Sequence, residues 1–238
     1  ANVSNNDVVL CPSLTFVASA SPILYQNACP VFLDSDENSW TLDCDALDIA
    51  IKKFKPKALI AVDIYGHSCD YDRIKILCEK NNVFLIEDAA EALGSQYKKK
   101  KCGTYGDIGI LSFNGNKIIT TSGGGMLLSD NPDFTKKAKF LSTQSREDKI
   151  HYEHKEIGYN YRLSNLLAAV GRGQLRVLSE RIKKKRRIFD YYQKSLSKIE
   201  GISFLEESKN TYSNRWLTTM LVDSKIFPNK QKEIIKNL

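Results

Sequence analysis

The stretch ALIAVDIYGHSCDYDRIKILCEKNNVFLIED, residues 58–88, decides the fold class of this chain. Residues 58–62 and 83–86 are continuous apolar runs of the composition that is typical of strands buried in a parallel sheet. Between them, residues 71–80 repeat apolar side chains at the spacing of an amphipathic helix. A strand, a helix and a second strand in this order predict a βαβ unit with a right-handed crossover.

Strands and helices alternate on both sides of this unit. Residues 8–10 and 31–33 have the composition of buried strands, and residues 42–54 have the pattern of a helix. Residues 107–113 and 124–129 predict two more strands, which flank a loop rich in glycine and threonine. The sequence therefore predicts an α/β fold with a doubly wound, mainly parallel sheet.

The pattern changes in the last third of the chain. Residues 163–197 are helical in pattern almost without interruption, which predicts a long connecting helix with Gly171 and Gly173 as its weak point. The elements expected after it are strands over 202–205 and 216–222 and a helix over 229–238. We therefore predict a large domain over residues 1–175, and the connecting helix with the start of a small domain over residues 176–238.

Composition limits the classes of function that the chain can have. It has 238 residues, of which 42% are hydrophobic, so it can form a large core. The formal net charge of +7 suits a phosphate-bearing ligand but is modest for a nucleic-acid-binding protein. Six cysteines without a C-x-x-C pair, together with only three histidines, indicate neither a disulfide framework nor a metal site.

The same features predict a cytoplasmic protein with reduced thiols. The longest apolar runs are shorter than the ~18 residues that cross a bilayer, and residues 1–7 are polar, unlike the core of a signal peptide. The basic runs at 98–101 and 183–187 are expected to be solvated rather than to attract a nucleotide. We therefore expect no nucleic-acid partner and no membrane partner.

Two polar residues lie where the ligands of open α/β sheets bind, after predicted strands. Asp88 ends the apolar run 83–86, where an acid can meet a cationic ligand atom or cap the next helix. Lys117 lies between SFNGN, residues 112–116, and TTSGGG, residues 120–125. A partly desolvated lysine can be a nucleophile, whereas a lone lysine is usually a surface charge. The three glycines allow a bulky ligand to approach the backbone closely.

Four motifs stand in the order found in the DegT/DnrJ/EryC1 family. They are PSLTF at 12–16, EDAAEALG at 87–94, SFNGNK at 112–117 followed by GGG at 123–125, and GYNYRL at 158–163. The chain therefore resembles this family of pyridoxal-phosphate-dependent sugar aminotransferases over nearly its whole length. The resemblance implies the fold type I architecture of aspartate aminotransferase, with part of a smaller C-terminal α+β domain, and pyridoxal 5'-phosphate as the cofactor.

The resemblance also implies roles for single residues. Lys117 would hold the cofactor covalently and, once released, act as the acid and base that moves a proton at the substrate carbon. Asp88 would pair with the pyridine nitrogen and keep it protonated, which requires a carboxylate. Phe16 occupies the place of the family's aromatic ring that stacks on the cofactor, although an aromatic side chain there can also belong to the core.

Three further residues are implied at the cofactor. Ser112 would bind its phosphate. Asn160 resembles the residue that reaches the phosphate from a neighbouring subunit, which implies a homodimer with shared sites, but it could also stabilise a turn beside Gly158. Glu91 lies where many relatives have a glutamine against the cofactor ring, and a glutamate there must be protonated or find a cation nearby.

Three segments narrow the resemblance within the family. KIITTSGGGM at 117–126, HYEH at 151–154 and SNRWL at 213–217 look closest to the bacillosamine-pathway aminotransferases of Campylobacter. The implied reaction is amino transfer from glutamate to a UDP-linked 4-keto-6-deoxy-N-acetylhexosamine, in the biosynthesis of a bacterial glycan. His151 and His154 receive no role.

Two other functions remain open for the same fold. In the sugar 3-dehydratases of the family a histidine replaces the lysine, so Lys117 favours amino transfer over dehydration. A non-catalytic regulator would sense the cofactor or the sugar through the same pocket.

The resemblance also sets an expectation for the ends of the chain. The family's segment Gly/Ser-Thr-Ala-Ala-Leu, whose backbone amides begin the phosphate cradle, is expected before residue 1. The remainder of the small domain is expected after residue 238. The chain is therefore expected to be an internal piece of a longer polypeptide.

Overall fold

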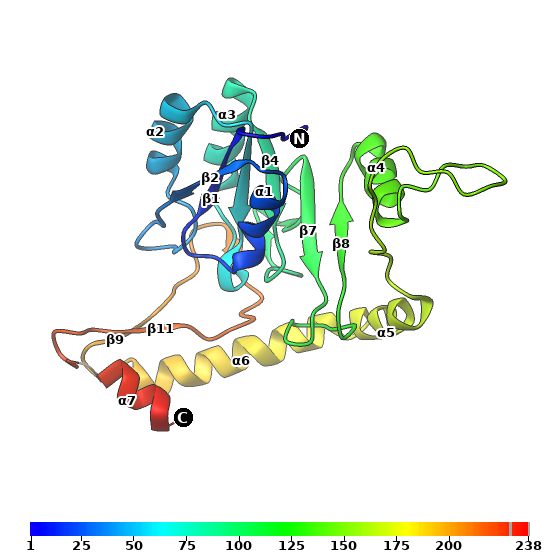
Figure 1. Cartoon of the computed structure of the whole chain (residues 1–238). Coiled ribbons are helices and arrows are strands. Elements are labelled where there is room, and N and C mark those ends of the chain that lie inside the picture. The colour runs from blue at the N-terminus through cyan, green and yellow to red at the C-terminus, as the bar shows by residue number, and fades with distance from the viewer. Residues whose placement is uncertain (229, 238) are drawn as a thin grey trace.

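The computed structural model describes residues 1–228 and 230–237. Its centre is a six-stranded sheet with the order β2-β1-β3-β4-β7-β8 (Figure 1). Neighbouring strands are parallel except for β8, which runs antiparallel to β7. The strands are β1 Val8–Pro12, β2 Cys29–Leu33, β3 Ala58–Val62, β4 Phe84–Asp88, β7 Ile108–Ser112 and β8 Gly125–Leu128. The predicted α/β fold with a mainly parallel sheet is confirmed.

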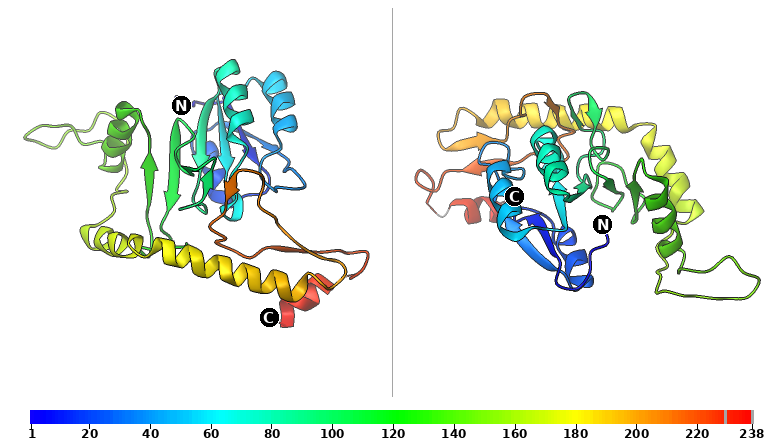
Figure 2. Two further views of the ribbon diagram at one scale, coloured as in Figure 1. Left: turned by 180° about the vertical axis from the view of Figure 1, so that it is seen from behind. Right: turned by 90° about the horizontal axis from the view of Figure 1, so that it is seen from above.

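Helices cover both faces of this sheet (Figure 2). The helices α2 Cys44–Phe54 and α3 Tyr71–Asn81 pack on one face through buried side chains such as Leu47 and Ile74. The short helix α1 Ser21–Tyr25 packs on the other face through Ile23. Because β1 is followed by β2 on one side and β3 lies on its other side, the chain changes direction at β1. Ligands of such sheets bind beside this switch point.

Local sequence explains where α2 and α3 begin and end. Asp43 accepts the N–H groups of the first turn of α2, and Asp70 accepts the N–H of Arg73 in α3. Each helix stops at a residue in the left-handed conformation, Lys55 after α2 and Asn82 after α3. The predicted helices over 42–54 and 71–80 therefore appear within two residues of their expected bounds.

After β8 the chain forms α4 Pro132–Ser142, then a projecting irregular segment over residues 143–163, and then α5 Asn165–Leu175 and α6 Leu178–Leu196 (Figure 1). The prediction that the long helix would weaken at its glycines is wrong. Gly171 stays inside α5, where a Cβ would lie 2.8 Å from Cγ2 of Thr121, so the glycine permits close packing. The break falls between α5 and α6, two residues after Gln174. The side-chain amide of Gln174 accepts the backbone N–H of Thr120 and donates to its carbonyl.

The remaining segment returns to the large sheet region before it ends. β9 Ile202–Phe204 pairs antiparallel with β11 Met220–Val222, and β10 Thr211–Tyr212 pairs with β5 Gln96–Tyr97, which also pairs with β6 Lys100–Lys101. The predicted strand over 216–222 is therefore too long at its beginning. Residues 213–216 are instead buried, with hydrogen bonds to residues of the large domain.

The last helix, α7, spans Lys230–Asn237, so residues 229 and 238 of the predicted helix lie outside the described residues. The division into domains at residue 175 stays a prediction.

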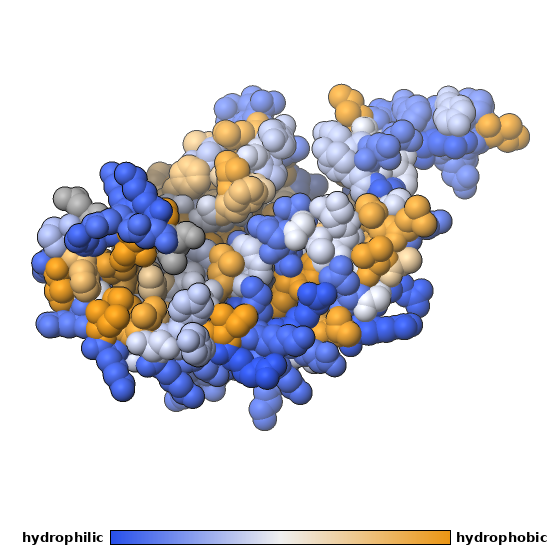
Figure 3. Space-filling view, turned by 90° about the horizontal axis from the view of Figure 1, so that it is seen from below, coloured by the Kyte–Doolittle hydropathy of each residue, from blue (hydrophilic) through white to orange (hydrophobic). Residues whose placement is uncertain are grey.

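Most residues of the two basic runs are exposed, as expected, but Arg186 is half-buried and pairs with Glu207. Lys183, Lys184 and Arg187 are exposed on α6, and residues 98–101 form an exposed hairpin turn. Figure 3, which shows the lower side of the molecule, has hydrophilic side chains over much of that side. In the part of the chain that the structure describes, none of the helices has the length and apolar character needed to span a bilayer.

Candidate active site

A cavity of about 480 Å³ lies at the carboxyl edge of the central sheet, beside the switch point. Its walls come from the ends of β3, β4 and β7 and from the segment that follows β1. Five of the six site residues predicted from the sequence line this cavity. They are Phe16, Asp88, Glu91, Ser112 and Lys117.

Asp88 is the last residue of β4, and its carboxylate is held by two groups. The Ser19 hydroxyl donates to Oδ2 at 2.7 Å, and the Ala90 N–H donates to Oδ1 at 3.1 Å. Ser19 is in turn 2.8 Å from the Thr15 hydroxyl. Residues 89–95 contain no helix, so the alternative that Asp88 caps a helix is wrong. Its carboxylate instead lines the cavity from a fixed position.

Lys117 follows β7 in the loop before the three glycines. Its side chain is only 11% exposed, so the alternative of a solvated surface charge is wrong. The Nζ atom lies 3.6 Å from Oε1 of Glu91 and 4.2 Å from the ring centroid of Trp216. The lysine amine is therefore held inside the cavity by a carboxylate and an aromatic face.

Glu91 has the nearby cation that its position requires. Its Oε1 faces Lys117, and its Oε2 accepts the Tyr65 N–H at 2.6 Å. Burial raises the pKa of Glu91 above its ordinary value, while the Tyr65 N–H and the Lys117 ammonium act in the opposite direction. The Lys117 ammonium and the Tyr65 N–H thus offset part of the cost of burying this carboxyl group.

Phe16 and Ser112 contribute an aromatic ring and a hydroxyl group to the cavity. Phe16 is 68% exposed, so the alternative that it belongs to the core is wrong. Ser112 is the last residue of β7, and its Oγ accepts the Asn114 N–H at 3.4 Å. Because that contact uses an acceptor of Ser112, the O–H remains able to donate to an anion.

Asn160 does not reach this cavity within the chain. It is exposed, pairs with Thr143 in an isolated bridge, and lines with Leu163 and Leu167 a neighbouring hollow, which shares Gly124 and Gly125 with the cavity. His151 and His154 lie earlier in the same projecting segment, before Asn160. His154 bonds to the Gln144 carbonyl.

Two further residues of the cavity had no role in the sequence-based prediction. Ser19 was missed because a serine 69 residues before Asp88 carries no sign of contact with it. Trp216 lies 100 residues after Asn116, to whose carbonyl its indole N–H donates at 2.8 Å. Only the SNRWL motif pointed to this region.

The geometry places an acid, a lysine and an aromatic ring together at the expected edge of the sheet. The family model described as the DegT/DnrJ/EryC1/StrS aminotransferase family matches residues 1–238. The chain belongs to this family.

Several curated proteins are similar to this DegT family chain, and two of the following three are named for a nucleotide-linked sugar. EpsN of Bacillus subtilis is 52% identical over 231 residues, which are 95% of this chain and 60% of EpsN. Its name assigns it provisionally to the pyridoxal phosphate-dependent aminotransferases. GDP-perosamine synthase of Escherichia coli O157:H7 is 39% identical, over 92% of this chain and 59% of the synthase. The UDP-4-amino-4,6-dideoxy-N-acetyl-beta-L-altrosamine transaminase of Campylobacter jejuni is 34% identical, over 94% of this chain and 61% of the transaminase.

Solved structures agree with this membership of the DegT family. Helicobacter pylori PseC, an aminotransferase involved in the biosynthesis of pseudoaminic acid, matches with a TM-score of 0.92 and 26% identity. The match covers 100% of this chain and 65% of PseC. The chain thus spans about 60% of the length of the curated relatives that it matches.

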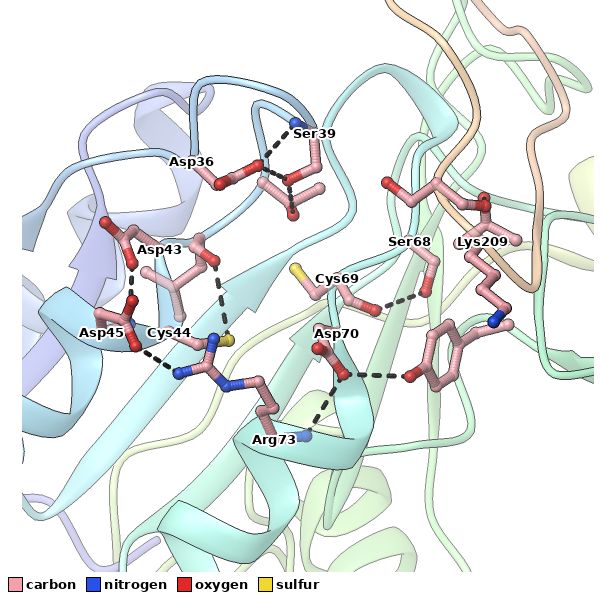
Figure 4. A pocket seen from close by; sticks show the side chains of 15 residues that line it. Asp36, Ser39, Asp43, Cys44, Asp45, Ser68, Cys69, Asp70, Arg73 and Lys209 are labelled. Atoms are coloured by element: carbon pink, nitrogen blue, oxygen red, sulfur yellow. Dashed lines mark hydrogen bonds and ion pairs between the residues drawn. The ribbon is translucent and has the colours of Figure 1, made fainter.

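A second cavity, of about 310 Å³, lies between the first turns of α2 and α3 (Figure 4). Several of its polar groups bind one another. Asp45 pairs with Arg73, Asp36 accepts from Ser39, and the Tyr97 hydroxyl donates to Asp70. We interpret these contacts as fixing the two helix starts beside the sheet.

One buried group offers three potential metal-ligand atoms within 4.8 Å of one another, from Asp63, Glu87 and Cys102. Both oxygens of Glu87 already accept backbone N–H groups, including those of Gly103 and Tyr105. Burial raises the pKa of the Cys102 thiol well above its ordinary value. A neutral thiol beside an occupied carboxylate is a poor ligand set, and we interpret the group as part of the core.

Proposed function

We propose that the protein is a pyridoxal-phosphate-dependent aminotransferase that transfers an amino group from glutamate to a nucleotide-linked keto sugar. The observation that carries the proposal is the nearly buried Lys117 amine in a cavity that also holds Asp88, at the switch point of the sheet. Membership of the DegT family supports it, as do relatives named for the synthesis of amino sugars.

The cavity fits the cofactor in its chemistry and its size. Its volume of about 480 Å³ lies in the range of small-molecule sites. An amine, a carboxylate, an exposed aromatic ring and a hydroxyl group line it, one for each part of the cofactor. When bound, pyridoxal phosphate supplies an aldehyde that carries amino groups and a ring that withdraws electrons from the amino-bearing carbon.

Lys117 and Asp88 perform the central tasks in this proposal. Lys117 holds the cofactor covalently, and after its release the free amine moves a proton to and from the substrate carbon. Asp88, fixed by Ser19, faces the pyridine nitrogen as a carboxylate and keeps it protonated. Glu91 holds the released amine of Lys117 near that proton-transfer position.

Phe16 and Ser112 bind rather than react. The exposed ring of Phe16 offers a flat apolar face for stacking, and the Ser112 hydroxyl donates to the phosphate. The phosphate-cradle segment expected before residue 1 stays a prediction.

The proposal includes a homodimer with shared sites and a cytoplasmic location. Asn160 lies outside the cavity of its own chain, as a residue that serves a neighbouring subunit would. Large apolar side chains are exposed in the same stretch of chain, at Tyr159 and Tyr161 beside Asn160 and at Leu166 and Val170 in α5. Apolar surface of this kind is typical of a protein interface.

The finer proposal for the substrate is a UDP-linked 4-keto-6-deoxy-N-acetylhexosamine, as in the bacillosamine pathway. The 34% identical Campylobacter relative is named for a UDP-linked sugar, which supports this choice. The 39% identical relative is named for GDP-perosamine, so a GDP-linked keto sugar is the comparison substrate in the test.

Two experiments test the proposal. Borohydride reduction of the full-length protein with pyridoxal phosphate, followed by peptide mapping, should place the adduct on Lys117, and an adduct on another lysine would refute the assignment. The protein loaded with pyridoxamine phosphate should convert the UDP-linked keto sugar to the 4-amino sugar, and glutamate should then regenerate the amine form and release 2-oxoglutarate. Loss of a sugar hydroxyl without gain of nitrogen would indicate a dehydratase, and cofactor binding without turnover on either keto sugar would indicate a sensor.

A further inference from the structure

Trp216 is a buried aromatic side chain whose position is fixed relative to Lys117. It is 6% exposed, and its indole N–H donates to the carbonyl of Asn116, the residue directly before the lysine. The Lys117 Nζ atom lies 4.2 Å from the centroid of the indole ring. A cation this close to the face of a tryptophan is attracted by the ring's negative face.

Asn214 connects Trp216 to Glu91, the other group that holds the lysine amine. Its Nδ2 donates to the backbone carbonyls of Glu91 at 2.8 Å and Leu93 at 3.0 Å. Its Oδ1 accepts a hydrogen bond from the backbone N–H of Trp216 at 2.8 Å. Asn214 is completely buried, so water does not compete for these bonds. The backbone positions of Glu91 and Trp216 are therefore set by one amide group.

The backbone beside Asn214 leaves room for this arrangement only because residue 66 is a glycine. A Cβ on Gly66 would lie 2.0 Å from Oδ1 of Asn214, and its φ of +88° is one that other residues rarely adopt. The preceding residue, Tyr65, has a φ of 54° and donates its N–H to Glu91. The strained turn at residues 65–66 thus serves both Glu91 and Asn214.

A free lysine amine needs such support during the proposed reaction. Its four-carbon stem has many rotamers, and a proton-transfer group must stay within hydrogen-bonding reach of the reacting atom. The indole face attracts the ammonium without accepting a conventional hydrogen bond. The N–H groups of Lys117 therefore remain available to Glu91 and to a bound substrate.

We propose that Trp216 is a positioning residue that keeps the released amine of Lys117 at its proton-transfer position, on the indole face and opposite Glu91. The inference rests on the proposed function, because it assigns a role to the same lysine. Trp216 lies in the segment after α6, whereas Lys117 follows β7, so the inference links two distant parts of the chain.

The first test measures the contact itself, without cofactor. Residues 1–238 contain two tryptophans, so in this 238-residue chain Trp40→Phe leaves Trp216 as the source of indole fluorescence. In that background, Lys117→Met should change the intensity and wavelength of the emission, because it removes the ammonium from the ring face. Lys136→Met, on the exposed surface of α4, is the matched control and should leave the emission unchanged. Equal spectra for the Lys117→Met and control variants would overturn the proposal.

The second test measures function in the holoenzyme. Trp216→Leu should lower kcat roughly 10- to 100-fold while the KM values for glutamate and keto sugar stay nearly constant, because a misplaced group slows the reaction rather than binding. Trp216→Phe keeps an aromatic face and should recover most of the lost rate. Normal kcat in Trp216→Leu, or no difference between the two variants, would overturn the positioning role.

The two tests separate this inference from the proposed function. If the unmodified protein neither binds pyridoxal phosphate, as judged by its absorbance, nor turns over, the proposed function fails whatever the fluorescence shows. If the unmodified protein is active, the variants decide on Trp216 alone. Should Trp216→Leu fail to fold, as judged by circular dichroism, the fluorescence comparison decides, and equal spectra for the Lys117→Met and Lys136→Met variants would overturn the inference.

Discussion

One carboxyl oxygen of Asp63 lies within 4.8 Å of a carboxyl oxygen of Glu87, and neither side chain is exposed to solvent. Oδ1 of Asp63 accepts hydrogen bonds from the Cys69 N–H and the Tyr71 hydroxyl, whereas Oδ2 has no partner among residues 1–228 and 230–237. Burial, and then the charge of Glu87, raise the pKa of Asp63 well above its ordinary value. Since Glu87 uses both oxygens as acceptors of backbone N–H groups, Asp63 is the member of the pair expected to carry the proton.

The two amide substitutions in this pair should therefore differ. In Asp63→Asn the new N–H group replaces the carboxylic acid proton, so the free energy of unfolding at pH 7 should change by less than about 1 kcal/mol. In Glu87→Gln an amide N–H group faces backbone N–H groups, so the protein should lose about 2–3 kcal/mol. Urea unfolding of both variants measures the difference, and equal losses would show that the proton lies elsewhere.

The stability of the unmodified protein should also depend on pH through Asp63. Because its folded-state pKa is raised, its contribution is fully present below the unfolded value of about 3.9 and is lost as the pH rises toward the folded value. Asp63→Asn should remove this part of the pH dependence. Identical curves of unfolding free energy against pH for the two proteins would contradict the assignment.

Asp88→Asn should leave the protein folded but slow the half-reaction with glutamate by at least about 100-fold, because a neutral amide no longer keeps the ring nitrogen protonated. Ser19→Ala, which removes one hydrogen bond of 2.7 Å to the same carboxylate, should slow it only by about a factor of ten or less. Rapid-mixing absorbance measures both rates. Near-normal turnover in Asp88→Asn is the result that would exclude the proposed role.

Mixed dimers test whether sites are shared between subunits. Lys117→Ala and Asn160→Asp should each be inactive alone, whereas heterodimers of the two should recover activity, since one of their sites receives the intact lysine and the intact asparagine. The assay requires heterodimers purified with two different affinity tags. An absence of recovery in verified heterodimers would place both residues in one subunit's own site.

His67 should make the protein less stable in mild acid. It is buried beside Arg215, with 3.1 Å between its Nε2 and the guanidinium, and burial followed by the charge of Arg215 lowers its pKa to about 4. Its contribution to stability is fully present above the unfolded value of about 6.5 and is lost as the pH falls toward 4, by up to about 1.4 kcal/mol per pH unit. His67→Gln keeps an acceptor for Arg215 without a titration, so its unfolding free energy should fall less over this pH range.

Much of the sheet could be predicted from the sequence because buried parallel strands are continuous apolar runs. β3 appears with its predicted bounds, and the polar residues after β4 and β7 line one cavity, as the rule for ligand sites in α/β sheets predicts. The motifs of the family supplied the roles of Lys117 and Asp88, which spacing alone left open between a reactive group and a surface charge or helix cap.

Contacts between distant segments could not be predicted in this way. The pattern around Trp216 suggested a strand, but its backbone leaves the strand conformation so that the indole can reach Asn116. Helix propensity is a local property, and it predicts the weak point of the long helix at Gly171 and Gly173 rather than between α5 and α6. Gly171 is instead required by the approach of Thr121, from another part of the chain.

The bond between Trp216 and Asn116 also has a consequence for the order of folding. The strands of the central sheet all lie within residues 8–128, so they can assemble while the rest of the chain is still being synthesised. The contacts of Asn214 with Glu91 and of Trp216 with Asn116 join residues that are 123 and 100 positions apart, and closing such long loops is entropically costly and slow. A nascent chain that ends before residue 214 therefore has Glu91 beside the Lys117 amine but lacks the indole face, which can contact the lysine only after residue 216 has been made.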